Sequence, residues 1–208
     1  IFPYSEEQIR EPALTRIPPH WGKLWSLDFG IDHPFAATLL LWDKDNNVIH
    51  VHYCYRAKGL LPINHAAALK QVGANVPVVW PHDGGQRRED RGETTTLAKQ
   101  YKSHGLLMMP THATFPDGGY STEAGILLMD EYMSQGRFRV ADHLTEWWDE
   151  FHLYHRKDGM IVKLNDDLMS ATRIGVMARR FARPVPLGSD RFKRRSGLVA
   201  ADVDFDLF

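Results

Sequence analysis

The sequence predicts an α/β fold in which a single mixed β-sheet is flanked by helices. Three observations predict this class. Three short, strongly apolar segments come first, and segments with helical and strand-like patterns alternate after them. The chain has 208 residues, 43% of them hydrophobic and 25% charged, which is enough for one globular domain with a sizeable core. We find no internal repeat, so the order of the elements has to define the architecture.

The first three elements are predicted strands, because each is rich in apolar and aromatic residues and too short for a stable helix. They span residues 24–29, 36–42 and 48–55. Residues 43–47, which separate the second strand from the third, are dense in turn formers. These two strands are therefore expected to pair as a hairpin.

Helices and strands then alternate. Residues 62–72 have helical spacing, with Pro62 suited to a first turn and Gly73 to a C-terminal cap. The later elements are predicted, in order, as strand 76–80, helix 95–101, strand 106–109, helix 121–133 with Ser121 as N-cap, strand 137–140, helix 145–154, a brief strand or turn at 160–163, and helix 166–182. Pro184 and Pro186 end the last helix.

Composition changes at both ends of the chain. Residues 1–21 are rich in proline and charge, which predicts a linker-like segment. Because the chain begins at Ile1 and not at Met, we expect it to be a piece of a longer polypeptide. Residues 22–183 are predicted to form the folded domain and residues 184–208 an irregular C-terminal tail.

The overall composition limits the possible functions. The formal net charge is −1, so any grip on an acidic polymer must come from local clusters of Lys and Arg. The single cysteine, Cys54, excludes an internal disulfide framework and a multi-thiolate zinc site. No apolar run approaches the roughly 20 residues that span a bilayer, so we expect no membrane contact.

Three leading antiparallel strands followed by helix, strand, helix, strand and helix is the element order of a ribonuclease H-like mixed sheet covered by helices. In open α/β sheets, binding sites lie at strand ends near a topological switch point. Acidic residues at strand ends are therefore the first candidates for a functional site.

Two aspartates occupy such positions. Asp28 lies in the first predicted strand among apolar residues, where a carboxylate is costly to desolvate unless a positive charge neutralises it. It would alternatively cap the turn at Gly30. Asp83 follows the predicted strand at 76–80, which would lie beside the first strand in this fold, and the two glycines after it leave room for a ligand or a backbone to approach. An aspartate before two glycines also forms an ordinary turn.

A third carboxylate comes from the start of the last helix. The positions three and four residues apart from Asp167 form an apolar stripe: Ala171, Ile174, Ala178 and Phe181. The corresponding positions from Asp166 form a face predicted to be largely solvated: Ser170, Arg173, Met177 and Arg180. Asp167 is therefore predicted to point towards the sheet, and Asp166 to be a capping residue or a secondary ligand.

Three converging carboxylates without histidine or thiolate suit a hard cation such as Mg²⁺ or Mn²⁺. Two such ions about 4 Å apart activate water and stabilise the leaving oxygen in phosphodiester hydrolysis. The predicted site is thus that of a nuclease, with two ions expected when DNA is bound.

Three segments resemble the nuclease domain of tailed-phage terminase large subunits of the P22-like, headful-packaging kind. They are Leu-Asp-Phe-Gly-Ile-Asp-His-Pro at 27–34, Trp-Pro-His-Asp-Gly-Gly at 80–85, and Lys-Leu-Asn-Asp-Asp-Leu at 163–168 with a basic helix after it. The resemblance covers nearly the whole chain. It implies that Asp28, Asp83 and Asp167 form the metal-binding triad, with Asp166 as an adjacent acid. The implied activity is endonucleolytic cutting of concatemeric double-stranded viral DNA during packaging.

The resemblance also implies partners. Such proteins carry an ATPase motor ahead of the nuclease, whereas this chain contains no Gly-x-x-x-x-Gly-Lys-Ser/Thr loop. The ATPase domain is therefore expected elsewhere in the same polypeptide. The portal protein and the small terminase subunit are the other expected partners, in the host cell cytoplasm during phage assembly.

Basic residues near the predicted site are candidates for DNA contacts. Arg87, Arg88 and Arg91 follow Asp83, and Lys163 precedes the acidic pair. A second basic group near the C-terminus includes Arg194 and Arg195. They would hold phosphates without reading bases, although a plain solvated surface explains them as well.

Two other functions stay open on the sequence alone. The same acids would serve a resolvase, transposase or exonuclease with the same fold and a different DNA substrate. Alternatively, the domain is a non-catalytic module that docks a packaging motor to the portal or to DNA.

Overall fold

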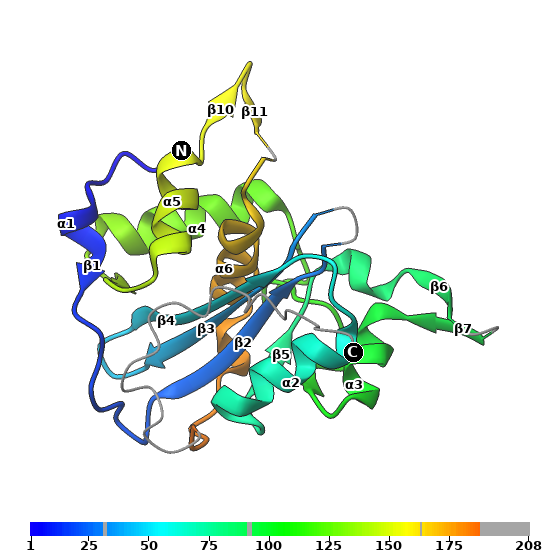
Figure 1. The fold of residues 1–208 in the computed structure, drawn as a ribbon. Coiled ribbons are helices and arrows are strands. Elements are labelled where there is room, and N and C mark those ends of the chain that lie inside the picture. The colour runs from blue at the N-terminus through cyan, green and yellow to red at the C-terminus, as the bar shows by residue number, and fades with distance from the viewer. Residues whose placement is uncertain (31–32, 91–92, 163, 188–208) are drawn as a thin grey trace, which may run out of the picture.

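A seven-stranded mixed sheet forms the centre of the computed structural model, which describes residues 1–30, 33–90, 93–162 and 164–187 (Figure 1). The strand order is β1-β9-β4-β3-β2-β5-β8. The strands are β1 (Arg10–Glu11), β2 (Gly22–Asp28), β3 (Phe35–Asp43), β4 (Val48–Ala57), β5 (Pro77–Val79), β8 (Leu107–Met108) and β9 (Phe138–Ala141). Two small hairpins lie outside this sheet, β6 (Arg87–Asp90) with β7 (Glu93–Thr96), and β10 (Arg156–Lys157) with β11 (Met160–Ile161). The predicted mixed α/β architecture is confirmed.

Strands β2, β3 and β4 form the predicted antiparallel meander. Leu24 lies opposite Leu40 across β2 and β3, and β3 pairs with β4 along its whole length, with one irregularity. The turn between β3 and β4 is held by Asp43, whose carboxylate accepts the backbone N–H of Asp45 at 3.1 Å and that of Asn46 at 3.3 Å. This turn chemistry explains why the hairpin was predictable from sequence.

Strand β5 lies parallel to β2 and beside it, in the register that pairs Trp25 with Val78 and Ser26 with Val79. Its other neighbour, β8, is also parallel. The carboxyl ends of β2 and β5 therefore meet at one edge of the sheet, while β3 runs back from that edge. This is the strand-end position at which a site was expected.

Helices cover both faces of the sheet. Their bounds are α1 (Glu6–Ile9), α2 (Pro62–Gly73), α3 (Leu97–Ser103), α4 (Thr122–Ser134), α5 (Thr145–Leu153) and α6 (Asp167–Met177), with short 3-10 turns at η1 (His82–Gly85) and η2 (Arg179–Phe181). Side chains alternate along β3 between two apolar cores on opposite faces of the sheet. In the first core, Leu39 and Leu41 pack with α2 and α3, and in the second core, Leu40 packs with α4, α5 and α6.

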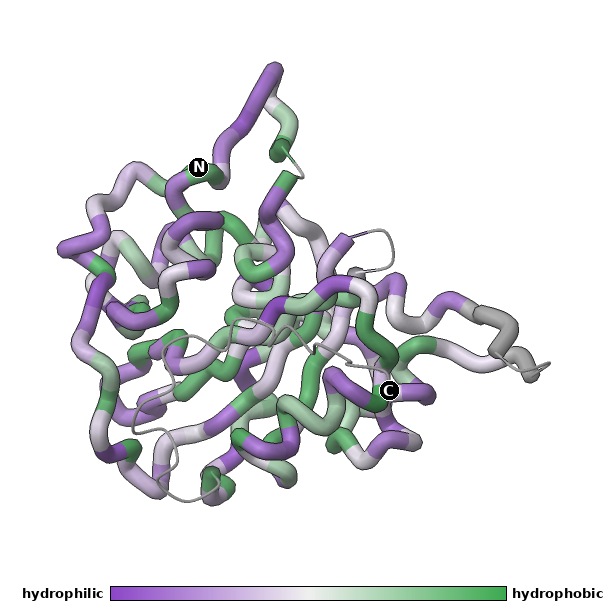
Figure 2. Tube along the Cα trace, in the orientation of Figure 1, coloured by the Kyte–Doolittle hydropathy of each residue, from purple (hydrophilic) through white to green (hydrophobic). Residues whose placement is uncertain are grey.

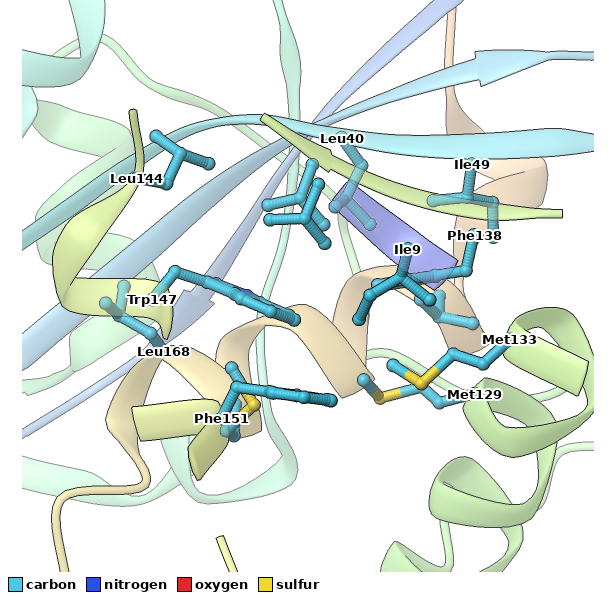
Figure 3. Close-up of a cluster of buried hydrophobic side chains, with 14 of the residues drawn as sticks. Ile9, Leu40, Ile49, Met129, Met133, Phe138, Leu144, Trp147, Phe151 and Leu168 are labelled. Carbon is cyan, nitrogen blue, oxygen red and sulfur yellow. The ribbon is translucent and has the colours of Figure 1, made fainter. Parts of the chain in front are cut away.

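The second core is built around two aromatic residues of α5. Figure 3 shows Trp147 and Phe151 facing Met129 and Met133 of α4 and the sheet residues above them. The two rings stack with centroids 5.3 Å apart. The Trp147 indole N–H also donates to the Thr172 hydroxyl of α6 at 2.9 Å. Helices α5 and α6 are therefore joined by both apolar packing and a buried hydrogen bond.

Most helix boundaries fall close to their predicted places. Ser121 is the N-cap of α4, and its hydroxyl accepts the Ala124 backbone N–H. Gly73 was predicted as a C-terminal cap but is the last residue of α2, and Ala74 takes the cap position. The last helix is shorter than predicted, because α6 ends at Met177 and a 3-10 turn follows it.

The N-terminal segment differs from the linker-like prediction for residues 1–21. Strand β1 pairs in parallel with β9, and Ile9 is fully buried in the core. A strand of two residues has no periodicity that sequence reasoning could detect. At the other end, Val185 and Leu187 pack against the first core, so the described part of the predicted tail is also attached.

The hairpin of β10 and β11 projects from the body, beside the start of the chain (Figure 1). Its first strand is hydrophilic (Figure 2). Arg156 of β10 forms an ion pair with Glu123 of α4 at 2.6 Å, which ties the hairpin to the body. In the described ranges, we find no helix long and apolar enough to cross a membrane.

Candidate metal centre

Asp28 and Asp83 leave the sheet at the same edge. Asp28 is the last residue of β2 and is half-buried, and Asp83 lies in the 3-10 turn η1 after β5. The Trp80 backbone carbonyl accepts the Ala113 N–H at 2.7 Å, and the Trp80 indole donates to the Met109 carbonyl at 2.8 Å. These bonds fix the start of the η1 turn, which places Asp83 beside the end of β2.

Gly84 lets this turn pack closely against β2. A Cβ atom at Gly84 would lie 2.2 Å from a ring carbon of Phe29, whereas at Gly85 it would lie 3.8 Å from Trp80. The two glycines were predicted to leave room for a ligand or a backbone to approach. For Gly84 the space is filled by the ring of Phe29, so its first role is to bring the Asp83 turn against the end of β2.

Asp167 begins α6 and is 7% exposed, in agreement with its predicted inward orientation. Asp166 occupies the N-cap position but makes no side-chain capping bond. The helix crosses β2 and β3 closely because residue 175 is glycine: a Cβ there would lie 2.5 Å from Leu40 Cδ1 and 2.6 Å from Ser26 Oγ. This contact brings the start of α6 towards the end of β2.

The four carboxylates interact electrostatically. Burial, and after it the negative charges of Asp83, Asp167 and Asp166, raise the pKa of Asp28 to about 7, although Arg173 opposes them. A buried carboxylate surrounded by like charges is unfavourable unless a cation neutralises it. The residues at this edge are therefore suited to hold positive charge.

Arg173 departs from the sequence-based expectation. Its helical stripe was predicted to be largely solvated, but Met177 of the same stripe is 3% exposed and Arg173 packs against α4. A Cβ at Gly125 of α4 would lie 2.7 Å from Arg173 Cγ. Burial lowers the pKa of the Arg173 guanidinium, and Tyr154, Asp28 and Asp166 raise it. Among the side chains that the structure describes, it is one of two arginines at the acidic cluster.

The second arginine comes from β4. Arg56 Nη2 lies 3.2 Å from Asp167 Oδ2, and Arg56 Nε lies 3.2 Å from the same oxygen. Arg56 Nε is also 3.5 Å from Glu150 Oε1 of α5. Sequence reasoning missed both Arg56 and Glu150. The signal for Glu150 was an acid among Trp147 and Phe151 on the apolar face of a predicted helix.

The acidic cluster has the donor chemistry of a divalent-cation site. Asp83 Oδ1 is buried and has no hydrogen-bond partner among the described residues, which leaves a carboxylate oxygen available as a ligand. The cluster offers only oxygen donors, which suits Mg²⁺ or Mn²⁺. In the arrangement seen for the described residues, no three His, Cys, Asp or Glu side chains surround a common ion position. Arg56 pairs with Asp167 there, so a cation would have to share that carboxylate with Arg56 or displace it.

The predicted DNA-contacting residues lie at the margins of what the structure describes. Arg87 and Arg88 are on β6, in the hairpin that follows the Asp83 turn, and only their backbone is described. Arg91, Lys163, Arg194 and Arg195 lie outside the described residues.

The chain is similar to known proteins along most of its length. Residues 25–179 match the family model of the terminase RNaseH-like domain. The large terminase subunit of Salmonella phage P22 is 42% identical over 184 residues, which cover 88% of this chain and 36% of that protein. The chain thus spans about a third of the length of this relative.

Solved structures show the same fold. The nuclease domain of the P22 large terminase superposes with a TM-score of 0.79 at 42% identity, covering 88% of this chain and 93% of that one. The large terminase nuclease of thermophilic phage G20c, solved with bound zinc, gives a TM-score of 0.53 at 18% identity and covers 80% of this chain and 91% of that one. At that identity the second match shows the fold alone.

Proposed function

Because this chain belongs to the terminase RNaseH-like domain family, we propose that it is a divalent-metal-dependent endonuclease that cuts double-stranded DNA during viral genome packaging. The observation that carries the proposal is the position of Asp28 and Asp83 at the ends of adjacent parallel strands, with Asp167 at the start of the helix that crosses β2. The electrostatic effect of Asp83 and Asp167 on Asp28 supports a shared site.

In this proposal Asp28, Asp83 and Asp167 hold the metal, and Asp166 is a secondary acid beside them. A bound divalent cation supplies Lewis-acid activation of water and stabilises the charge that develops on the phosphodiester. Asp28 has to be deprotonated to bind a cation, because a neutral carboxyl group is a poor ligand. The zinc-bound G20c structure is in keeping with a divalent ion, and Mg²⁺ or Mn²⁺, two of them with DNA bound, is our specific proposal.

The arginines divide between two roles. Arg173 and Arg56 partly neutralise the carboxylates within the domain, and Arg87, Arg88, Arg91, Lys163, Arg194 and Arg195 are proposed to hold DNA phosphates. Contacts of that kind carry no sequence information, which suits an enzyme that cuts DNA at many sequences.

The wider assignment follows from the same family. We propose residues 22–183 as the nuclease domain, with β1 and Ile9 of the preceding segment packed onto it, working with an ATPase domain of the same polypeptide. The portal protein and the small terminase subunit are the proposed partners, and the host cytoplasm during phage assembly is the proposed location.

Plasmid cleavage tests the proposal. With Mn²⁺ or Mg²⁺ the purified protein should nick or linearise supercoiled DNA, and Asp28→Asn, Asp83→Asn and Asp167→Asn should each abolish cutting. Asp149→Asn is the matched control, because this aspartate is exposed on α5. Cutting by all three variants at the parent rate would refute the assignment. Cutting of only branched or single-stranded substrates would favour a resolvase or exonuclease, and Mn²⁺-independent DNA binding without cutting would favour a docking module.

A further inference from the structure

Glu150 is a buried carboxylate that caps a helix to which it is not adjacent in sequence. Its Oε2 accepts the backbone N–H of Leu168 at 2.7 Å and that of Met169 at 3.1 Å, in the first turn of α6. Those N–H groups have no partner inside the helix and carry partial positive charge. Glu150 thus occupies the place that the local N-cap residue, Asp166, does not fill with its own side chain.

The cap fixes the start of α6 against α5. A local N-cap would stabilise the helix without determining where it lies, whereas a cap from α5 sets its position. The buried bond from Trp147 to Thr172 and the bond from the Thr172 hydroxyl to the Leu168 carbonyl at 2.7 Å reinforce the same junction. Asp167, the residue directly before the two capped N–H groups, is held in place by this junction.

Arg56 connects the cap to Asp167 itself. Its guanidinium lies 3.5 Å from Glu150 and 3.2 Å from Asp167, and it also donates to the Asn165 side chain at 3.5 Å. The side chains of Glu150 and Asp167 are 2% and 10% exposed, so these charges interact in a largely dry environment. A planar guanidinium can contact two carboxylates in a fixed geometry, which the flexible ammonium group of lysine cannot.

We propose that Glu150 and Arg56 are positioning residues for Asp167: Glu150 sets the backbone of the first turn of α6 and anchors Arg56, and Arg56 holds Asp167 Oδ2 so that a cation shares the carboxylate with it. The inference rests on the proposed function, because it treats Asp167 as a metal ligand. Glu150 itself accepts hydrogen bonds from the helix backbone and forms an ion pair with Arg56 at 3.5 Å, so it acts through other residues. Partners of this kind behind a ligand commonly change metal affinity or activity by about 10–100-fold when they are replaced.

The decisive variant is Glu150→Gln. Glutamine keeps an oxygen that can accept from the α6 backbone, so the fold should persist, but it removes the charge that holds Arg56. We expect Mn²⁺ affinity measured by calorimetry to fall about 10–100-fold. Plasmid cleavage at saturating Mn²⁺ should show a lower kcat with little change in KM for DNA. Amide hydrogen exchange at Leu168 and Met169 should accelerate.

A second variant, Arg56→Lys, keeps the positive charge beside Asp167. It should lower Mn²⁺ affinity and kcat as well, by a smaller factor than Glu150→Gln. The controls are Glu131→Gln and Arg137→Lys, which alter an ion pair of 3.4 Å between α4 and the turn that follows it. They should leave Mn²⁺ affinity and kcat within twofold of the parent. A general loss of stability would lower the melting temperature without moving the Mn²⁺ midpoint of the folded protein.

The outcomes separate the inference from the proposed function. If the parent binds Mn²⁺ and cuts DNA while folded Glu150→Gln and Arg56→Lys match it in affinity and kcat, the positioning role is wrong and the nuclease assignment stands. If the parent neither binds Mn²⁺ nor cuts, the proposed function fails and the positioning of a metal ligand fails with it.

Discussion

Ser26 of β2 is the parallel register partner of Val79 of β5. Two residues after Ser26 the chain reaches Asp28, and four residues after Val79 it reaches Asp83, so both carboxylates emerge at one edge of the sheet. This pairing brings together two acids that are 55 positions apart in the sequence. It also explains why Asp83 is the largest electrostatic contributor, after burial, to the raised pKa of Asp28.

The metal-free protein should lose stability as the pH rises, because Asp28 has a pKa raised from 3.8 to about 7 in the folded state. The folded protein binds this proton more tightly than the unfolded chain. The resulting stabilisation is complete below about pH 4 and is lost as the pH rises through 7. In EDTA, Asp28→Asn should therefore flatten the decline of the melting temperature between pH 5 and pH 8. Parallel curves for parent and variant would contradict the assigned pKa shift.

Gly84→Ala should destabilise the protein and disturb the Asp83 turn. The new Cβ would lie 2.2 Å from Phe29, and overpacking of this kind costs about 1–3 kcal/mol. Gly85→Ala is the matched control, because its Cβ would make only an ordinary contact at 3.8 Å with Trp80. Urea denaturation should show a lower midpoint for Gly84→Ala and little change for Gly85→Ala. Equal midpoints would show that the turn does not depend on this close approach.

The sequence predicted the sheet well because each of its long strands carries a local signal. The turn of Asp43 specifies the β3–β4 hairpin, and alternation along β3 separates the residues of the two cores. The predicted adjacency of the Asp28 and Asp83 strands is confirmed by the β2–β5 pairing. Local pattern and overall fold agree at these positions, which is why they could be predicted.

Other features depend on contacts between distant residues and leave no local pattern. Strand β1 depends on the burial of Ile9 in the core and on pairing with β9, and neither contact is visible in residues 1–21. The pairing of Arg56 with Asp167 spans 111 positions. Glu150 did carry a signal, an acid on an apolar helix face, but nothing in the sequence identified the helix end that it caps.

Asp167 and Asp166 should differ in their importance for metal binding. Asp167 is 7% exposed and faces the sheet, whereas Asp166 is half-buried at the N-cap position. We expect Asp167→Asn to abolish Mn²⁺ binding in calorimetry. Asp166→Asn, which removes only a neighbouring charge, should weaken it about tenfold or less, equivalent to about 1.4 kcal/mol. A larger loss with Asp166→Asn than with Asp167→Asn would reverse the assignment of ligand and secondary acid.

DNA binding by the basic residues should depend on salt. Each phosphate contact that is removed should reduce the slope of log affinity against log salt by about 0.9. In EDTA, where cutting is prevented, replacement of Arg87 and Arg88 by Gln should therefore reduce the slope by about 1.8. Replacement of Arg194 and Arg195 by Gln tests the second basic group in the same way. Arg137→Gln is the control, because Arg137 forms an ion pair with Glu131 of α4.

The result of this titration locates the DNA path. A reduced slope for the Arg87 and Arg88 variant alone would place the backbone along the β6–β7 hairpin, next to the Asp83 turn from which it leads. A reduction for the Arg194 and Arg195 variant alone would place it along the C-terminal residues. Unchanged slopes in both variants, with parent-like cleavage, would exclude both groups as phosphate contacts. Phosphate binding would then have to come from other basic residues, of which Arg173 and Arg56 lie at the acidic cluster itself.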